Sequence, residues 1–377
     1  MIFKKYYFVI IIFSLLLGSC KDDDPKPEKE LPFRTVLIYL AANNDLFNDA
    51  YNSIEQIEQN IEEVDGNLIV YARLPGENPA LYHISNSKGK RQKQKIKEYS
   101  VHNSSDPTVL RQVINEVKNL YEAKTYGLIL WSHATGWVPQ DVGPIKLRSF
   151  GNDDGDRMDI KELNTAIPSN LFDFVMFDAC SMASVEVLYE IKDKAKYFIA
   201  SPGEVVSSGM PYDKMVNDLF GKDKQAYFNL ARKYFEYYNS LSGYSQSATI
   251  SVIEASKLSN IANLTKKTLE EQEPLFPDFN RDQIQRMDFD RFNNPLIAFD
   301  FIDFVETNYN NTYLNLLKSA VTEAVIYQAH TAKFNGFEIN KFSGLTCYIP
   351  HEENEEVVHS YYRTLKWYSE SGFNTLF

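Results

Sequence analysis

The stretch Leu128-Ile-Leu-Trp-Ser-His133-Ala-Thr-Gly-Trp137 decides the predicted fold, together with its partner Phe174-Val-Met-Phe-Asp178-Ala-Cys180-Ser-Met182. In each stretch a short run of apolar residues ends on polar or small residues. Such runs are typical of the buried strands of a parallel sheet, and open α/β sheets carry their sites beyond the carboxyl ends of those strands. One run delivers His133 and the other delivers Cys180, which makes them a candidate catalytic pair.

The chemistry of this pair depends on the surroundings of the sulfur. A cysteine nucleophile acts as a thiolate, which is favoured at a helix N-terminus or beside a histidine. We expect a helix over 181–191, so that its first N–H groups point at Cys180 and also serve an oxyanion. Histidine ordinarily titrates near neutral pH, so His133 is the candidate general acid and base. On these residues alone, a loop histidine and an unrelated buried cysteine are an equal alternative.

Length and composition indicate a globular α/β protein. The chain has 377 residues, of which 44% are hydrophobic, enough for one large domain or two ordinary ones. The net charge of −12 argues against nucleic acid as a partner, because phosphate binding requires a concentrated basic face. The one basic cluster, 88–97, alternates as expected for the solvated face of a hairpin strand. No partner subunit is predicted.

The order of apolar runs and helical patterns predicts a mostly parallel sheet flanked by helices. We expect an α/β core over about 34–254 and a mainly helical extension over about 255–377, within one domain, 34–377. The predicted strands are 35–42, 67–74, a hairpin over 81–101, 128–133, 172–177, 197–200, 248–253 and 345–349. The predicted helices are 46–61, 107–123, 159–167, 181–191, 222–241, 255–271, 295–306 and 312–329.

The amino terminus has the pattern of a secretory signal. Lys4 and Lys5 precede an apolar stretch, 6–17, that is too short to span a membrane, and Gly18-Ser19 then leads to Cys20. The ending Leu17-Gly-Ser-Cys20 resembles the bacterial lipobox, which implies cleavage after residue 19 and lipidation of Cys20. The third cysteine, Cys347, alternates with its neighbours in a predicted strand and is expected to be a buried core residue.

The segment 20–33 that follows is predicted to be a disordered tether, since Lys21 to Glu30 contain no apolar residue to bury. Lys21 and the acids after it resemble the export signal of Bacteroidetes-type lipoproteins. This resemblance implies an outer-membrane lipoprotein exposed at the cell surface; the alternative is the periplasmic side. Membrane attachment is expected only through lipidated Cys20.

No metal or cofactor is required by the motifs. The acidic run Asp153-Asp-Gly-Asp156 with Asp159 is a candidate calcium site, but it lacks the glutamate and the loop length of an EF-hand. A solvated loop followed by a helix cap explains the same residues. Histidine and cysteine spacing does not fit zinc, and no phosphate-binding glycine loop follows a predicted strand.

Six motifs resemble, in order, those of the clostripain-like cysteine peptidases. The resemblance covers nearly all of 34–377 and implies a caspase-like fold with His133 and Cys180 as the catalytic dyad. It places Asp178 in the pocket for the residue before the cut, where family members prefer Arg or Lys, and a carboxylate suits those cations. A hydrogen-bond acceptor at a strand end is the alternative role for Asp178. The motifs are Tyr39 to Leu46, Leu128 to Trp137, Phe177 to Met182, Gly209 to Tyr212, Gly344 to Pro350 and Trp367 to Phe373.

The resemblance also implies self-activation by cleavage in the loop after the histidine, where Lys146 and Arg148 are the candidate sites. Two departures weaken it. Ala134 stands where the family has glycine; it keeps its N–H for the oxyanion, beside that of Cys180, but alanine resists a positive φ. The 204–209 loop also lacks the aspartate that some relatives use to bind Arg or Lys, and Glu204 is the only acid in this loop that could bind substrate in its place. We therefore predict a thiol endopeptidase acting on peptides or proteins; the alternative is an inactive, peptidase-like surface lipoprotein that binds peptide or a protein partner.

Overall fold

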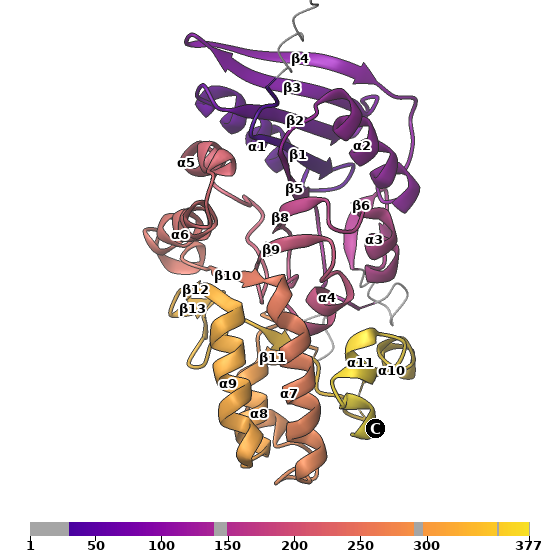
Figure 1. Ribbon diagram of the computed structural model, residues 1–377, viewed down its shortest axis with the longest axis vertical. Coiled ribbons are helices and arrows are strands. Elements are labelled where there is room, and N and C mark those ends of the chain that lie inside the picture. The colour runs from indigo at the N-terminus through magenta and orange to yellow at the C-terminus, as the bar shows by residue number, and fades with distance from the viewer. Residues whose placement is uncertain (1–29, 139–148, 290–296, 353, 377) are drawn as a thin grey trace, which may run out of the picture. The chain divides into compact units, whose positions relative to one another are not determined.

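A nine-stranded sheet carries the fold, with the strand order β12-β10-β9-β8-β5-β1-β2-β3-β4 (Figure 1). The computed structural model describes residues 30–138, 149–289, 297–352 and 354–376. The five central strands pair in parallel, as predicted, and the strands at both edges pair antiparallel. These five are β1 (Arg34–Ala41), β2 (Gly66–Arg73), β5 (Thr125–Trp131), β8 (Phe172–Asp178) and β9 (Ala195–Ala200).

Alternate residues of each central strand enter two separate cores, one on each face of the sheet. On β1, Leu37 and Tyr39 join the core covered by α2, α3 and α4, whereas Val36 and Ile38 join the core covered by α1, α5 and α6. All eight residues of β1 are buried, which explains the continuous apolar run. The six helices are α1 (Phe47–Asn60), α2 (Pro107–Leu120), α3 (Ile160–Ala166), α4 (Val185–Glu190), α5 (Tyr212–Met215) and α6 (Gln225–Asn239).

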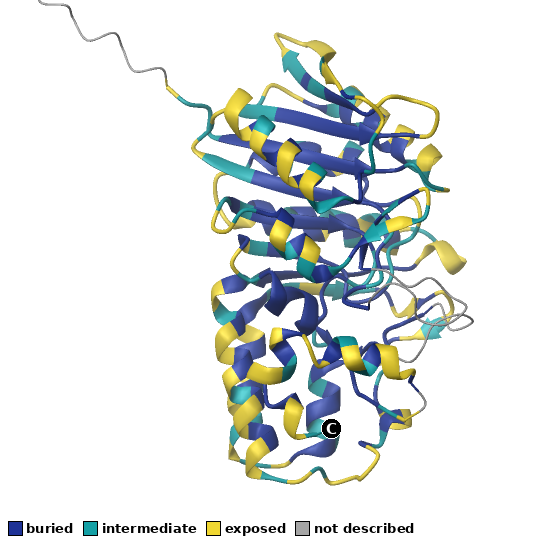
Figure 2. Cartoon of the chain, turned by 90° about the vertical axis from the view of Figure 1, so that its right-hand side faces the viewer, coloured by how far each residue is buried: buried dark blue, intermediate teal, exposed yellow. Residues whose placement is uncertain are grey.

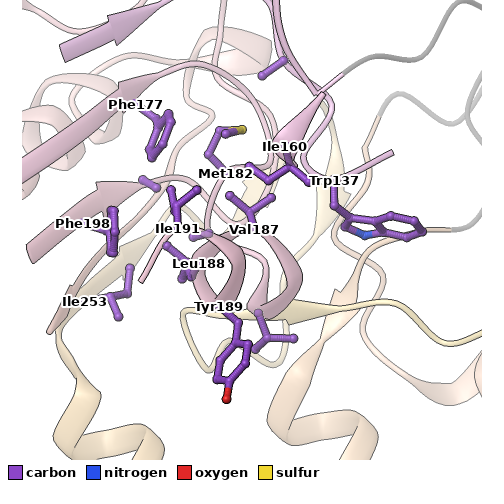
Figure 3. Packing of buried hydrophobic residues seen from close by; sticks show 14 of the residues in the cluster. Trp137, Ile160, Phe177, Met182, Val187, Leu188, Tyr189, Ile191, Phe198 and Ile253 are labelled. Carbon is purple, nitrogen blue, oxygen red and sulfur yellow. The ribbon is translucent and has the colours of Figure 1, made fainter. Parts of the chain in front are cut away.

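Helix α4 illustrates this packing. Val187, Leu188 and Ile191 project from the helix and its end toward Phe177 of β8 and Phe198 of β9 (Figure 3). Figure 2 shows the result across the fold: the central strands are largely buried, and the surface helices turn exposed faces outward. The fold is therefore a mixed α/β structure with a large, mostly parallel sheet flanked by helices.

The basic cluster lies on β4 (Lys90–Glu98), the outermost strand of the hairpin with β3 (Ala80–Ser87). All residues of β4 but one are exposed, which confirms the prediction of a solvated hairpin strand. Lys93 pairs with Glu58 and Lys97 with Glu116. Charged side chains on an exposed edge strand discourage pairing with another chain.

The carboxyl-terminal third contains more strand than the sequence suggested. The predicted helix 312–329 is wrong at its end, because α9 (Thr312–Ala324) stops and β12 (Val325–His330) pairs antiparallel with β10 (Thr249–Glu254). Val325-Ile-Tyr327 opens this strand with β-branched and aromatic residues, which suit a half-buried sheet edge. The other elements here are α7 (Leu258–Glu271), β11 (Phe299–Asp300), α8 (Phe301–Asn308), β13 (Lys333–Phe334), β14 (Phe337–Glu338), β15 (Thr346–Cys347), α10 (Glu356–Tyr362) and α11 (Lys366–Glu370).

Candidate active site

His133 and Cys180 follow neighbouring strands at the same edge of the sheet. In the parallel register of β5 and β8, Trp131 is paired with Asp178, so each candidate residue comes two positions beyond that pair. Both line one cavity of about 450 Å³. The structure therefore brings together the two residues that the sequence could only place at like positions on separate strands.

Cys180 lies in a turn and not at a helix N-terminus, so the predicted helix start at Ser181 is wrong. Ser181 has φ 59°, a left-handed conformation that a helix cannot contain, and its N–H donates to Gly203 O at 2.7 Å. Helix α4 begins only at Val185, with Ser184 as its N-cap. Its unpaired N–H groups are therefore not directly behind the sulfur.

The sulfur of Cys180 is held by the 201–206 loop. Val205 N donates to Sγ at 3.3 Å, and the side chain is partly exposed to the cavity but enclosed by protein elsewhere. This burial raises the pKa of the thiol to about 12; the Val205 N–H opposes the shift, and the charges of Glu204 and Asp178 add to it. The thiol is thus protonated in this arrangement, and its activation requires a base that acts when substrate is bound.

His133 forms its side-chain hydrogen bond with Asp45, whose Oδ1 lies 2.8 Å from Nε2. Partial burial of Asp45 disfavours its charge, but the hydrogen bond and charge of His133 outweigh it and lower the pKa of the carboxyl. Within the described ranges, no hydrogen bond joins His133 to Cys180. In the sequence, Asp45 falls only between the predicted strand 35–42 and the predicted helix 46–61. The pairing of β1 with β5 is what brings the end of β1 beside His133.

Ala134 does not adopt the positive φ that alanine would resist. The left-handed residue of this loop is Gly136, at φ 70°. Ala134 faces Phe150 across an isolated antiparallel bridge whose hydrogen bonds come from the flanking residues. In the described part of the chain, the N–H groups of Ala134 and Cys180 have no acceptor.

Asp178 lines the cavity but is only 4% exposed. Its Oδ2 accepts hydrogen bonds from Met210 N at 3.1 Å and Tyr212 Oη at 3.0 Å, and burial raises the pKa of the carboxyl to about 6. A Cβ at Gly209 would come within 2.8 Å of Oδ1, so glycine is required there. Asp178 therefore anchors the 209–212 loop, as its alternative role suggested, and also faces the cavity.

Glu204 lies earlier in the connection between β9 and α5 and lines the same cavity. Its Oε1 accepts a hydrogen bond from Phe289 N at 2.7 Å. Phe289 stacks on Phe334, with ring centroids 4.9 Å apart, and Phe334 and Asn335 of the β13–β14 hairpin complete this wall. The sequence did not indicate these aromatic residues, because they approach the cavity only through the folding of the carboxyl-terminal third.

Two of the acidic residues considered for calcium, Asp153 and Asp159, bind protein groups. Asp153 is buried, accepts hydrogen bonds from Ser104 and Asn43, and lies 3.5 Å from the guanidinium of Arg73. Asp159 caps α3 in a capping box. Among the described residues, no three His, Cys, Asp or Glu side chains form a group suited to a metal ion. Cys20, Lys146 and Arg148 lie outside the described residues.

A cysteine and a histidine at neighbouring strand ends of such a sheet define the class of caspase-like cysteine peptidases. The family model of the clostripain family, Peptidase_C11, matches residues 38–376. This chain belongs to the clostripain family. Clostripain of Hathewaya histolytica is 27% identical over an alignment of 216 residues, which covers 48% of this chain and only 41% of that protein.

Two solved structures resemble nearly the whole chain. An inactive zymogen C11 protease from Parabacteroides distasonis has a TM-score of 0.79 and 29% identity, covering 91% of this chain and 99% of that one. A secreted C11 cysteine protease from Bacteroides thetaiotaomicron, in complex with an irreversible peptide inhibitor, has a TM-score of 0.78 with the same identity and coverage. The similarity thus extends from the central sheet through the carboxyl-terminal third.

Proposed function

We propose that the protein is a cysteine endopeptidase in which Cys180 is the nucleophile and His133 is the general acid and base. The observation that carries this proposal is a single cavity lined by both residues, at adjacent strand ends. The backbone N–H groups of Ala134 and Cys180, for which the described residues provide no acceptor, lie in the loops that follow β5 and β8. A cysteine peptidase requires a nucleophilic sulfur and a base, which form the dyad, and in addition hydrogen-bond donors for the oxyanion.

The reaction follows from these groups. His133 removes the thiol proton as Cys180 Sγ attacks the peptide carbonyl, and the backbone N–H groups of Ala134 and Cys180 hold the resulting oxyanion. When the tetrahedral intermediate collapses, His133 gives the proton to the leaving amine and a thioester remains. Water, deprotonated by His133, then attacks the thioester, and Cys180 leaves with the proton as a thiol. Because deprotonation is coupled to attack, no thiolate has to exist before substrate binds, and burial of this thiol disfavours such a thiolate.

Labelling with a peptidyl-Arg acyloxymethylketone tests this proposal. We expect modification of Cys180 in wild type and none in Cys180→Ala. Cys347→Ala is the matched control, because Cys347 is 1% exposed and its loss should leave labelling intact. Absence of labelling together with absence of peptide hydrolysis in the processed protein would contradict the proposed endopeptidase activity.

We further propose a preference for Arg or Lys before the cut, because the carboxylates of Asp178 and Glu204 line the cavity beside Cys180. Asp178→Asn should raise KM for Arg and Lys substrates about tenfold while leaving an uncharged substrate nearly unaffected. Tyr212→Phe is the control, since it removes the hydrogen bond to Asp178 and keeps the charge. Equal losses in the two variants would assign Asp178 a structural role alone.

Self-activation by cleavage after Lys146 or Arg148 is part of the proposal. The support is the position of both residues in the sequence between His133 and Cys180, and the similarity to a C11 protease solved as an inactive zymogen. Wild type should separate into two fragments during purification, whereas Cys180→Ala and a Lys146→Gln, Arg148→Gln double variant should stay whole. Identical fragments in wild type and Cys180→Ala would instead show that another protease performs the cleavage.

The second candidate function is an inactive relative that binds peptide or a protein partner. The observation favouring it is the resting arrangement: the thiol is held by Val205, its pKa is raised, and His133 bonds to Asp45. This candidate predicts peptide binding by Cys180→Ala and wild type alike, with no turnover by either. Isothermal titration beside the labelling experiment distinguishes the two functions.

Lipidation of Cys20 and exposure at the outer surface of the outer membrane are also proposed, on the signal-like residues 1–19 and the acidic residues after Cys20. In the described part of the chain, no helix has the length and apolar character to cross a bilayer. Added protease should digest the protein on intact cells, and Cys20→Ala should release it from the membrane fraction. Resistance of the wild type on intact cells would favour the periplasmic side.

A further inference from the structure

The turn after β1, Asn43-Asn44-Asp45, is fixed to a hairpin that follows His133 in the sequence. Asn44 Nδ2 donates to Asn152 O at 2.7 Å and to Ala41 O at 3.0 Å. From the hairpin, Asp154 N donates to Asn43 O at 3.0 Å. The hairpin consists of β6 (Phe150–Asp153) and β7 (Asp156–Met158). These bonds set the direction of the turn independently of any contact that Asp45 makes.

Asp45 uses this fixed position to reach His133. The distance from Asp45 Oδ1 to His133 Nε2 is 2.8 Å, and an ionised carboxylate can only accept a hydrogen bond. The proton of the neutral ring must therefore sit on Nε2. Because the imidazole has two nitrogens, Nδ1 alone is left with a lone pair for proton transfer.

We propose that Asp45 is the positioning residue of the peptidase: it holds His133 in the Nε2–H tautomer and assigns proton exchange with Cys180 and the leaving amine to Nδ1. The inference rests on the proposed dyad and adds a third member to it. Asp45 is not among the residues that line the cavity with Cys180, so it acts through His133. The negative charge also stabilises the imidazolium that forms each time His133 takes a proton.

The charged groups around the pair fit this role. Arg157 of β7 is the cation that acts on Asp45 and helps to keep the carboxyl ionised. On the other side of His133, the cavity holds Asp178, Cys180 and Glu204. The side chain of Asp45 is 79% exposed and that of His133 is 29% exposed, so solvent weakens their attraction. Removing Asp45 should therefore lower kcat about fivefold, far less than the loss of a buried partner would.

Steady-state kinetics of Asp45→Ala and Asp45→Asn test the inference in the processed enzyme. Asp45→Ala should lower kcat about fivefold with KM unchanged within about twofold, and Asp45→Asn should recover part of the loss because its amide oxygen still accepts from Nε2–H. Asp154→Asn is the control: Asp154 lines a separate surface hollow together with Asp45 and Arg157, so the change removes one negative charge near Asp45 but no bond to His133, and asparagine tolerates its φ of 50°. Its kinetics should match wild type.

A second measurement needs no activity. In Cys180→Ala with ¹⁵N-labelled histidine, the His133 ring should show the Nε2–H tautomer near neutral pH, and adding Asp45→Ala should produce a mixture of tautomers. Wild-type kcat in Asp45→Ala, or an unchanged tautomer in the double variant, overturns the role of Asp45. A protein that neither labels nor hydrolyses peptides but shows the expected tautomers contradicts the proposed function while leaving the positioning contact intact.

Discussion

Glu186 gives the sharpest test of the energetics of this fold. It stands in the first turn of α4, six positions after Cys180, and its side chain is fully buried. Oε1 accepts a hydrogen bond from Tyr348 N at 2.8 Å, which joins the catalytic side of the sheet to the carboxyl-terminal third. Burial raises the pKa of this carboxyl from 4.5 to about 7 against the opposing effect of that hydrogen bond.

The sign of the pH dependence follows from proton binding. Between the unfolded pKa of 4.5 and the folded pKa of about 7, the native state holds a proton that the unfolded state has lost. Stability therefore falls as pH rises through this window. At about 1.4 kcal/mol per pH unit, the full effect is about 3 kcal/mol of unfolding free energy.

Glu186→Gln isolates this contribution, because glutamine keeps an acceptor for Tyr348 N and has no charge to bury. The unfolding free energy of the variant relative to wild type should rise by about 3 kcal/mol between about pH 4 and about pH 8, measured by urea denaturation. Asp178 and Asp300, whose pKa values burial also raises to about 6, affect both proteins equally. The exposed Glu122, changed to Gln, is the control and should give a constant difference. If the unfolding free energy of Glu186→Gln relative to wild type does not change with pH over this range, the reasoning is refuted.

Three further changes test the site and the core. Ser181→Val should lower the unfolding free energy by about 1–2 kcal/mol, because a β-branched residue resists φ 59°, whereas Ser181→Gly should be nearly neutral; urea denaturation checks both. Ala134→Gly should change kcat/KM less than about twofold, since no positive φ is required there, and a large gain would contradict this. Arg34→Met should cost about 3 kcal/mol or more in thermal or urea unfolding, because Arg34 is 1% exposed, donates to Leu219 O and pairs with Asp173; a loss below about 1 kcal/mol would count against the buried pair.

The parallel core was predictable because its strands are buried on both faces. β5 and β8 therefore appear in the sequence as uninterrupted apolar runs, and His133 and Cys180 stand out as the reactive side chains just beyond their ends. The adjacency of the two strands was not predictable from composition, since register comes from pairing across the sheet. The family resemblance supplied that information.

Features set by tertiary contacts were missed. The pattern after Cys180 is helical, yet Ser181 turns left-handed because its N–H bonds to Gly203 in the loop after β9. The pattern of 312–329 is likewise helical, but β10 offers an open edge that Val325 to His330 can pair with. The neighbours of Asp45 indicate only a capping residue, and the pairing of β1 with β5 is what brings it to His133.

The junction between the turn that carries Cys180 and the last strand has a consequence for folding during synthesis. Thr346 N donates to Ala183 O at 3.2 Å, and Glu186 and Tyr348 are bonded across 162 positions of chain. Such distant contacts form late, because the entropy of closing a long loop must be overcome first. A nascent chain that still lacks its carboxyl-terminal third therefore lacks the contacts that support the turn carrying Cys180. The order of folding delays assembly of the cavity until almost the entire polypeptide has emerged.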